Sequence, residues 1–132
     1  MDDATTPLTL LRERALDMQG RRAEQLADIT ALSDLAQAAA DRNWLATAAD
    51  RHCDFLESTG DRANALRTAR VAMALAEQAG SAELLLRAQT RAARSLYRLG
   101  DTQAGIALAR EGLEAARHQG LREMEGLYLN SL

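Results

Sequence analysis

The chain has 132 residues, a net charge of −3 and a pI near 5.4, and all 16 of its basic residues are arginine. An acidic chain lacks the cation density that binding to phosphate backbones requires, so we expect no nucleic-acid partner. No apolar run approaches the length of a membrane span, and the amino-terminal residues lack the regions of a signal peptide. We therefore expect a cytoplasmic protein with no membrane partner. Cys53, the single cysteine, excludes an internal disulfide.

Five of the eight glycines recur at a spacing of about twenty residues, at Gly20, Gly60, Gly80, Gly100 and Gly120. The surrounding residues recur at about forty, because the Gly-Asp pair at 60–61 returns at 100–101. Self-similarity at this period indicates a repeat protein. The chain is rich in alanine, leucine, glutamate and arginine and has one proline, a composition that favours helix throughout. We expect an all-α fold.

Apolar residues at helical spacing fill the intervals between these glycines. We expect helices over 7–19, 21–41, 43–59, 61–79, 81–99, 101–119 and 121–132. Their short connections predict antiparallel neighbours. Asp61, Ser81 and Asp101 stand where helix N-caps are expected. One lattice position holds Ala40 in place of glycine, and there we expect the residues at 41–43 to form the turn, since Asn43 tolerates the left-handed conformation.

Small residues also recur at a spacing of forty, at points where helices would approach closely. The matched pairs are Cys53 with Ala93, Ala65 with Gly105, and Ala72 with Gly112. With the leucines at 56 and 96 ahead of the two Gly-Asp turns, this pattern resembles the tetratricopeptide repeat, best over residues 44–119. The resemblance implies helix–turn–helix repeats stacked in a right-handed superhelix, an α-solenoid. Helical pairs of the HEAT or armadillo kind rank second, because they lack the Gly-Asp turn in this register.

The expected repeats cover residues 5–41, 43–80, 81–120 and, incompletely, 121–132. Two features depart from the tetratricopeptide pattern. The period is about forty instead of 34, and the first repeat carries Glu13, Gln25 and Leu32 where small residues are expected. Longer repeats of this kind are similar to those in large bacterial regulators, and the resemblance therefore implies a part of such a protein.

An arginine row is the sharpest chemical feature. Arg87, Arg91, Arg94 and Arg98 share one face of one expected helix. The resemblance implies that this face lines a concave groove, where guanidinium groups suit an acidic or phosphorylated segment and Tyr97 could stack on it. The preceding first helix carries three acids on a similar face, at Asp50, Asp54 and Glu57. The two rows either bind a partner or pair with each other as an internal ladder.

Residues that suggest catalysis or metal binding have simpler explanations. His52, Cys53 and Asp54 are adjacent on a helix, so their side chains diverge and do not converge on one ion. The glycines at 100 and 105 lack the lysine of a phosphate loop and follow a helix. We expect no enzyme activity, no cofactor and no metal.

The sequence therefore predicts a non-enzymatic scaffold that binds a peptide or protein segment in its concave groove. A self-association module is the alternative, and a small-ligand sensor ranks third. The last expected helix is only half a repeat, so its apolar side chains lack a covering partner helix. We expect these residues to dock on a second copy and form a homodimer: Leu127, Tyr128, Leu129 and Leu132.

Overall fold

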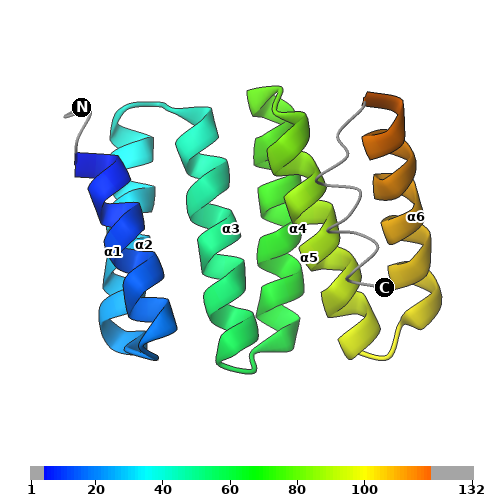
Figure 1. Ribbon diagram of the computed structural model, residues 1–132, viewed down its shortest axis with the longest axis horizontal. Coiled ribbons are helices and arrows are strands. Elements are labelled where there is room, and N and C mark those ends of the chain that lie inside the picture. The colour runs from blue at the N-terminus through cyan, green and yellow to red at the C-terminus, as the bar shows by residue number, and fades with distance from the viewer. Residues whose placement is uncertain (1–4, 120–132) are drawn as a thin grey trace.

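The computed structural model describes residues 5–119, which form six α-helices and contain no β-strand. The helices are α1 (Thr5–Met18), α2 (Arg22–Ala38), α3 (Arg42–Ser58), α4 (Arg62–Ala79), α5 (Ala82–Arg98) and α6 (Thr102–Gln119). Each runs antiparallel to the helix before it and packs against it, which makes a single row (Figure 1). The all-α prediction is confirmed, and every end of these six helices lies within three residues of its expected position. The helix expected at 121–132 lies outside the described residues.

The turns repeat with the sequence. Gly60 and Gly100 adopt φ values of 83° and 93°, a left-handed conformation that glycine reaches without a Cβ penalty. The aspartate after each glycine caps the next helix, since Asp61 accepts a hydrogen bond from the Asn64 amide at 3.4 Å and Asp101 one from the Ala104 amide at 3.3 Å. Gly-Asp is thus a stop signal followed by a start signal.

The turn between α2 and α3 was predicted wrongly. Ala40 itself takes the left-handed conformation, with φ 50°, in the place where the other turns have glycine. Asp41 caps α3 by accepting a hydrogen bond from the Trp44 amide at 3.1 Å, and Asn43 lies inside α3. The geometry of the turn is therefore kept at a cost of about 1–2 kcal/mol for a left-handed alanine.

Small residues allow the helices to approach closely. Ala65, Ala69, Ala72 and Ala76 form a buried stripe along α4, each at most 2% exposed. At Gly105 on α6 the approach is close enough that a Cβ atom built there would lie 2.8 Å from the Ala93 carbonyl oxygen of α5. Recurring small residues therefore set the distances between helices over much of the row.

The six helices form two layers. The odd-numbered helices α1, α3 and α5 share one side, which we call the first-helix face, and α2, α4 and α6 share the other, the second-helix face (Figure 1). Within residues 5–119, no helix is long and apolar enough to cross a membrane.

Candidate functional site

The first-helix face carries a network of ion pairs that links α1 to α3. Arg51 of α3 lies between the two helices, with only 11% of its side chain exposed. Its Nε donates to Glu13 Oε1, and its Nη2 donates to Asp17 Oδ2 and Asp54 Oδ2 at 3.2 Å each. Gln25 of α2 donates its side-chain amide to Glu13 Oε2 at 2.7 Å. The fully buried Glu13 is therefore hydrogen-bonded from two helices.

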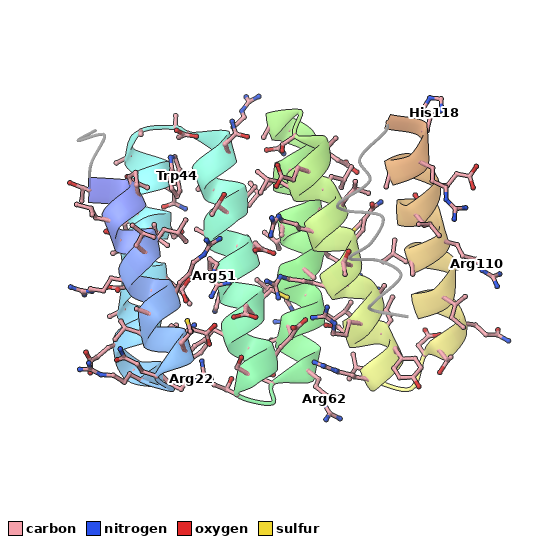
Figure 2. The ribbon with its side chains drawn as sticks, in the orientation of Figure 1. Arg22, Trp44, Arg51, Arg62, Arg110 and His118 are labelled. Atoms are coloured by element: carbon pink, nitrogen blue, oxygen red, sulfur yellow. The ribbon has the colours of Figure 1, made fainter. Side chains whose placement is uncertain are left out.

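The same arrangement links α3 to α5. Arg91 donates from Nε to Asp50 Oδ1 at 2.5 Å and from Nη1 to Asp54 Oδ1 at 3.3 Å, and it lies 3.5 Å from Glu57 Oε2. Arg94 also lies 3.5 Å from Glu57. Arg51 precedes Arg91 by one repeat of forty residues, so one repeat position carries both links (Figure 2 labels Arg51).

The charges in this network shift one another's pKa values. Burial alone would lower the pKa of Arg91, but the carboxylates of Asp50, Asp54 and Glu57 raise it above its ordinary value. Burial raises the pKa of Asp54, although both arginines act in the opposite direction. Arg91 therefore stays charged, and its charge is paired with carboxylates of its own chain.

The eight residues predicted to line a concave binding face separate into two groups. Five of them belong to the ion-pair network: Asp50, Asp54, Glu57, Arg91 and Arg94. The other three are on α5 outside it. Arg87 makes an exposed pair with Glu83 at 3.3 Å, and Tyr97 and Arg98 are exposed near the end of α5. The predicted self-association residues Leu127, Tyr128, Leu129 and Leu132 lie outside the described residues.

Sequence reasoning missed the half of the network that involves α1. Asp17 lies forty residues before Glu57, and Arg51 lies forty before Arg91, so the period itself carries the signal. The resulting Asp17–Arg51 and Glu57–Arg91 pairs have the same sequence separation.

Cys53 and His52 have different environments. The Cys53 thiol is buried and donates to the Ala65 carbonyl at 3.3 Å, and burial raises its pKa to about 12. It therefore stays protonated and unreactive at neutral pH. Half-buried His52 has its pKa lowered by burial. Across residues 5–119, no group of three or more histidine, cysteine or acidic side chains could hold a metal ion.

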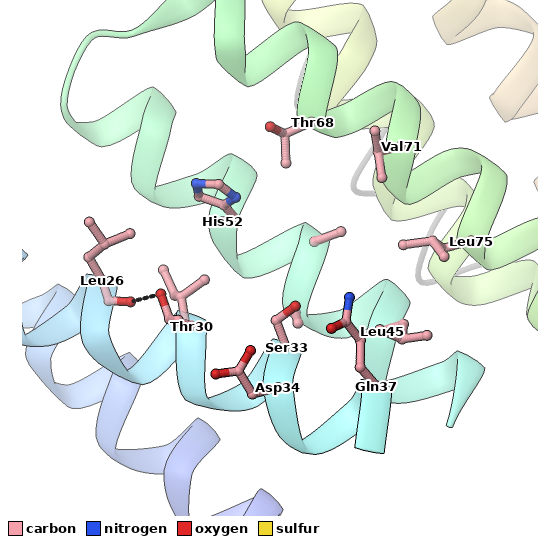
Figure 3. Close-up of a pocket in the computed structure, with 13 residues that line it drawn as sticks. Leu26, Thr30, Ser33, Asp34, Gln37, Leu45, His52, Thr68, Val71 and Leu75 are labelled. Carbon is pink, nitrogen blue, oxygen red and sulfur yellow. Dashed lines mark hydrogen bonds between the residues drawn. The ribbon is translucent and has the colours of Figure 1, made fainter. Parts of the chain in front are cut away.

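A groove of about 570 Å³ opens on the second-helix face, between α2 and α4 with α3 as its floor. We call it the α2–α4 groove. Figure 3 shows side chains from all three helices around it, with His52 and Leu45 of α3 at opposite ends. Its lining residues are Leu26, Ile29, Thr30, Ser33, Asp34, Gln37, Leu45, Ala48, Ala49, His52, Thr68, Val71 and Leu75.

One repeat further along, larger apolar side chains occupy the equivalent positions. Met73 and Leu108 stand forty residues after Ser33 and Thr68. Together with Leu66 they pack against the buried cluster formed by Cys53, Ala65, Ala69 and Ala92. Two small polar residues in place of two large apolar ones therefore leave the α2–α4 groove open.

The walls of the groove carry both exposed apolar and charged side chains. Leu26 is 40% exposed and Val71 is 50% exposed on facing walls. Asp34 lines the α2 wall, while Arg67 and Arg70 line an adjoining hollow on α4 that shares Val71 with the groove. None of these three charges makes an ion pair with another described residue, in contrast to the charges of the network on the first-helix face.

Comparison with known proteins found no matching family model, no matching curated protein and no matching solved structure.

Proposed function

We propose that this chain is a non-enzymatic interaction scaffold that binds a segment of a partner protein. As the framework we propose a right-handed superhelix of the tetratricopeptide kind, within a cytoplasmic bacterial regulator. The repeated Gly-Asp turns and the close approach of α6 to α5 at Gly105 support this framework.

The observation that carries the proposal is the open, partly apolar α2–α4 groove. An acidic segment that bound Arg91 on the first-helix face would have to displace Asp50 and leave its carboxylate, in a residue only 8% exposed, without its cation. Breaking a buried pair in this way is costly. The groove needs no such exchange, because its apolar walls already face solvent. Burying such walls is what drives most protein association.

A peptide-display selection against the purified protein tests this function. Enriched peptides are re-tested on the double variant Ser33→Met/Thr68→Leu, which fills the groove with the residues found one repeat later. The control is Arg87→Ala/Arg98→Ala, which removes two exposed charges of α5. We expect the groove-filled variant to lose the peptides and the control to keep them. Loss only in the arginine variant would move the site to the first-helix face, and a selection that enriches nothing would refute the scaffold.

Self-association is the second candidate function, favoured by the outer helix α1. Leu8 and Leu11 are 62% and 61% exposed on this helix, at one end of the row (Figure 1). In a repeat array an end with uncovered leucines suits the stacking of another helical pair. Sedimentation of Leu8→Glu/Leu11→Glu beside the wild type tests it. A concentration-dependent dimer that this variant abolishes would support the module, and a wild-type monomer at every concentration would exclude it.

A further inference from the structure

The α2–α4 groove has the form of a seat for one more helix. Its lining positions on α2 recur at 26, 29, 30, 33, 34 and 37, a complete helical stripe of about three turns, or roughly 16 Å at 1.5 Å per residue. The lining positions on α3 and α4 follow the same three- and four-residue steps. The groove therefore runs along the helices, with a length that matches a ligand helix of about three turns.

The lining also discriminates between kinds of peptide. An extended peptide would lay unpaired backbone N–H and C=O groups over Ile29, Leu45 and Ala48, whereas a helix satisfies its own backbone. A polyproline segment docks in grooves lined by aromatic rings, and the lining here has none except the imidazole of His52. The chemistry favours a helix that presents an apolar stripe.

The unpaired charges on the walls specify what flanks that stripe. Asp34 stands on the α2 side, between Thr30 and Gln37, and Arg67 and Arg70 stand on the α4 side. Complementary charges across a rim fix register and select partners more than they add affinity. We propose that the groove binds an amphipathic helix of about three turns from a partner protein, with a basic residue beside Asp34 and an acidic residue beside Arg67 and Arg70. This inference rests on the proposed function.

The probe is a designed helical peptide of about 16 residues with a leucine stripe, lysine on one flank and glutamate on the other. A second peptide carries glutamine at both flanks, and a third has a central proline that breaks the helix. Binding of each fluorescent peptide to the full chain is measured by anisotropy at low salt. We expect the charged peptide to bind best, the glutamine peptide about threefold more weakly for each exposed pair lost, and the proline peptide at least tenfold more weakly.

Protein variants locate the contacts. Asp34→Ala should weaken the lysine-bearing peptide about threefold and leave the glutamine peptide unchanged, and Arg67→Ala/Arg70→Ala should do the same through the glutamate flank. Val71→Glu, which copies Glu111 from the next repeat at a half-exposed site, should weaken every peptide tenfold or more. It serves as a second groove variant if Ser33→Met/Thr68→Leu does not fold.

Three results would overturn the inference. They are equal binding of the proline peptide, indifference of the charged peptide to both charge-removing variants, and a dimer of the chain that Val71→Glu abolishes, which would make a second copy the occupant. The two proposals fail separately. If display-selected peptides need the groove but the helical probe does not bind, only the helical partner is wrong. If no selected peptide is sensitive to Val71→Glu or Ser33→Met/Thr68→Leu, the proposed groove function is wrong as well.

Discussion

The helix pairs at the two ends of the row pack together through different kinds of contact. At equivalent positions, eighty residues or two repeats apart, α1 and α2 meet through Glu13 and Gln25, whereas α5 and α6 meet through Ala93 and Gly105. The first contact is a buried side-chain hydrogen bond completed by Arg51 of α3, and the last is nearly bare backbone against backbone. The repeat therefore conserves the direction of its helices while its contacts change from polar at one end to close-packed at the other.

The largest loss of stability should come from removing the arginine that links α1 to α3 at the polar end. Arg51→Met leaves the fully buried Glu13 carboxylate without its cation, and we expect a loss on the order of 3 kcal/mol in the free energy of unfolding. Urea unfolding measures it. Arg87→Ala is the control, because its pair with Glu83 is exposed and contributes about 0–0.5 kcal/mol. Adding Glu13→Leu to Arg51→Met should recover part of the loss, because the unpaired carboxylate is removed but the buried Gln25 amide loses its acceptor. No recovery would mean that the packing of Arg51 and the hydrogen bond from Gln25 matter more than the unpaired charge.

The close-packed end should respond to a single methyl group. In Gly105→Ala, the new Cβ would lie 2.8 Å from the Ala93 carbonyl oxygen and 3.2 Å from the Tyr97 amide nitrogen, so that α5 and α6 must separate. We expect a loss of about 1–3 kcal/mol, seen as a lower thermal midpoint. In an open helical position the same change would gain up to about 1 kcal/mol from helix propensity. A raised midpoint would therefore show that the two backbones are not in contact.

Placing the apolar residues of a later repeat at the equivalent positions nearer the polar end should raise the stability of the fold, in contrast to the two losses above. Ser33→Met/Thr68→Leu places in the α2–α4 groove the residue types found at the equivalent positions one repeat later, and we expect a gain of about 1 kcal/mol from the apolar area that they bury. Calorimetry of the double variant measures this gain. A loss would indicate that the walls of the groove stand too close together to admit the larger side chains.

The smallest effect concerns pH. Burial lowers the pKa of His52 from 6.5, so the unfolded chain takes up a proton at this residue at a higher pH than the folded chain does. The resulting loss of stability is absent well above pH 6.5 and grows as the pH falls through that value. His52→Ala, which copies Ala92 of the next repeat, should reduce the fall in thermal midpoint between pH 7.5 and 5.5. Identical pH profiles would place the histidine in a solvent-like environment.

Much of the fold could be predicted because its signals are local and repeated. Glycines at fixed spacing end helices, and Asp61, Ser81 and Asp101 begin them. Ala40 could not be predicted in this way, because the backbone hydrogen bonds of the turn and the capped helix after it hold a conformation that its own residue type disfavours. A residue at a repeated turn position can therefore adopt the conformation of that turn even when its own type disfavours it.

The candidate site was harder to predict, because a groove depends on side chains that are missing. Ser33 keeps the register of the α2 stripe. Nothing in α2 alone indicates that its counterpart one repeat later is a methionine that packs against the same buried cluster as a leucine of another helix. The ion pairs on α5 were foreseeable from arginines facing acids one repeat earlier. Which of those arginines form ion pairs within the chain depends on how deeply each is buried, and the sequence of one helix does not show this.

The charge links between repeats have a consequence for how such an array could lengthen by duplication. Arg51 reaches back to Asp17 and Arg91 reaches back to Glu57, but the same position in α5 is Tyr97. A tandem copy of the α5–α6 unit, stacked after the original in the same register, would set its arginine against the phenol of Tyr97 in place of a carboxylate. A copy of the α3–α4 unit inserted between α4 and α5 would bring both an arginine for Glu57 and an acid for Arg91. The α3–α4 unit is therefore the repeat that could be duplicated while every arginine–acid pair between neighbouring repeats is kept.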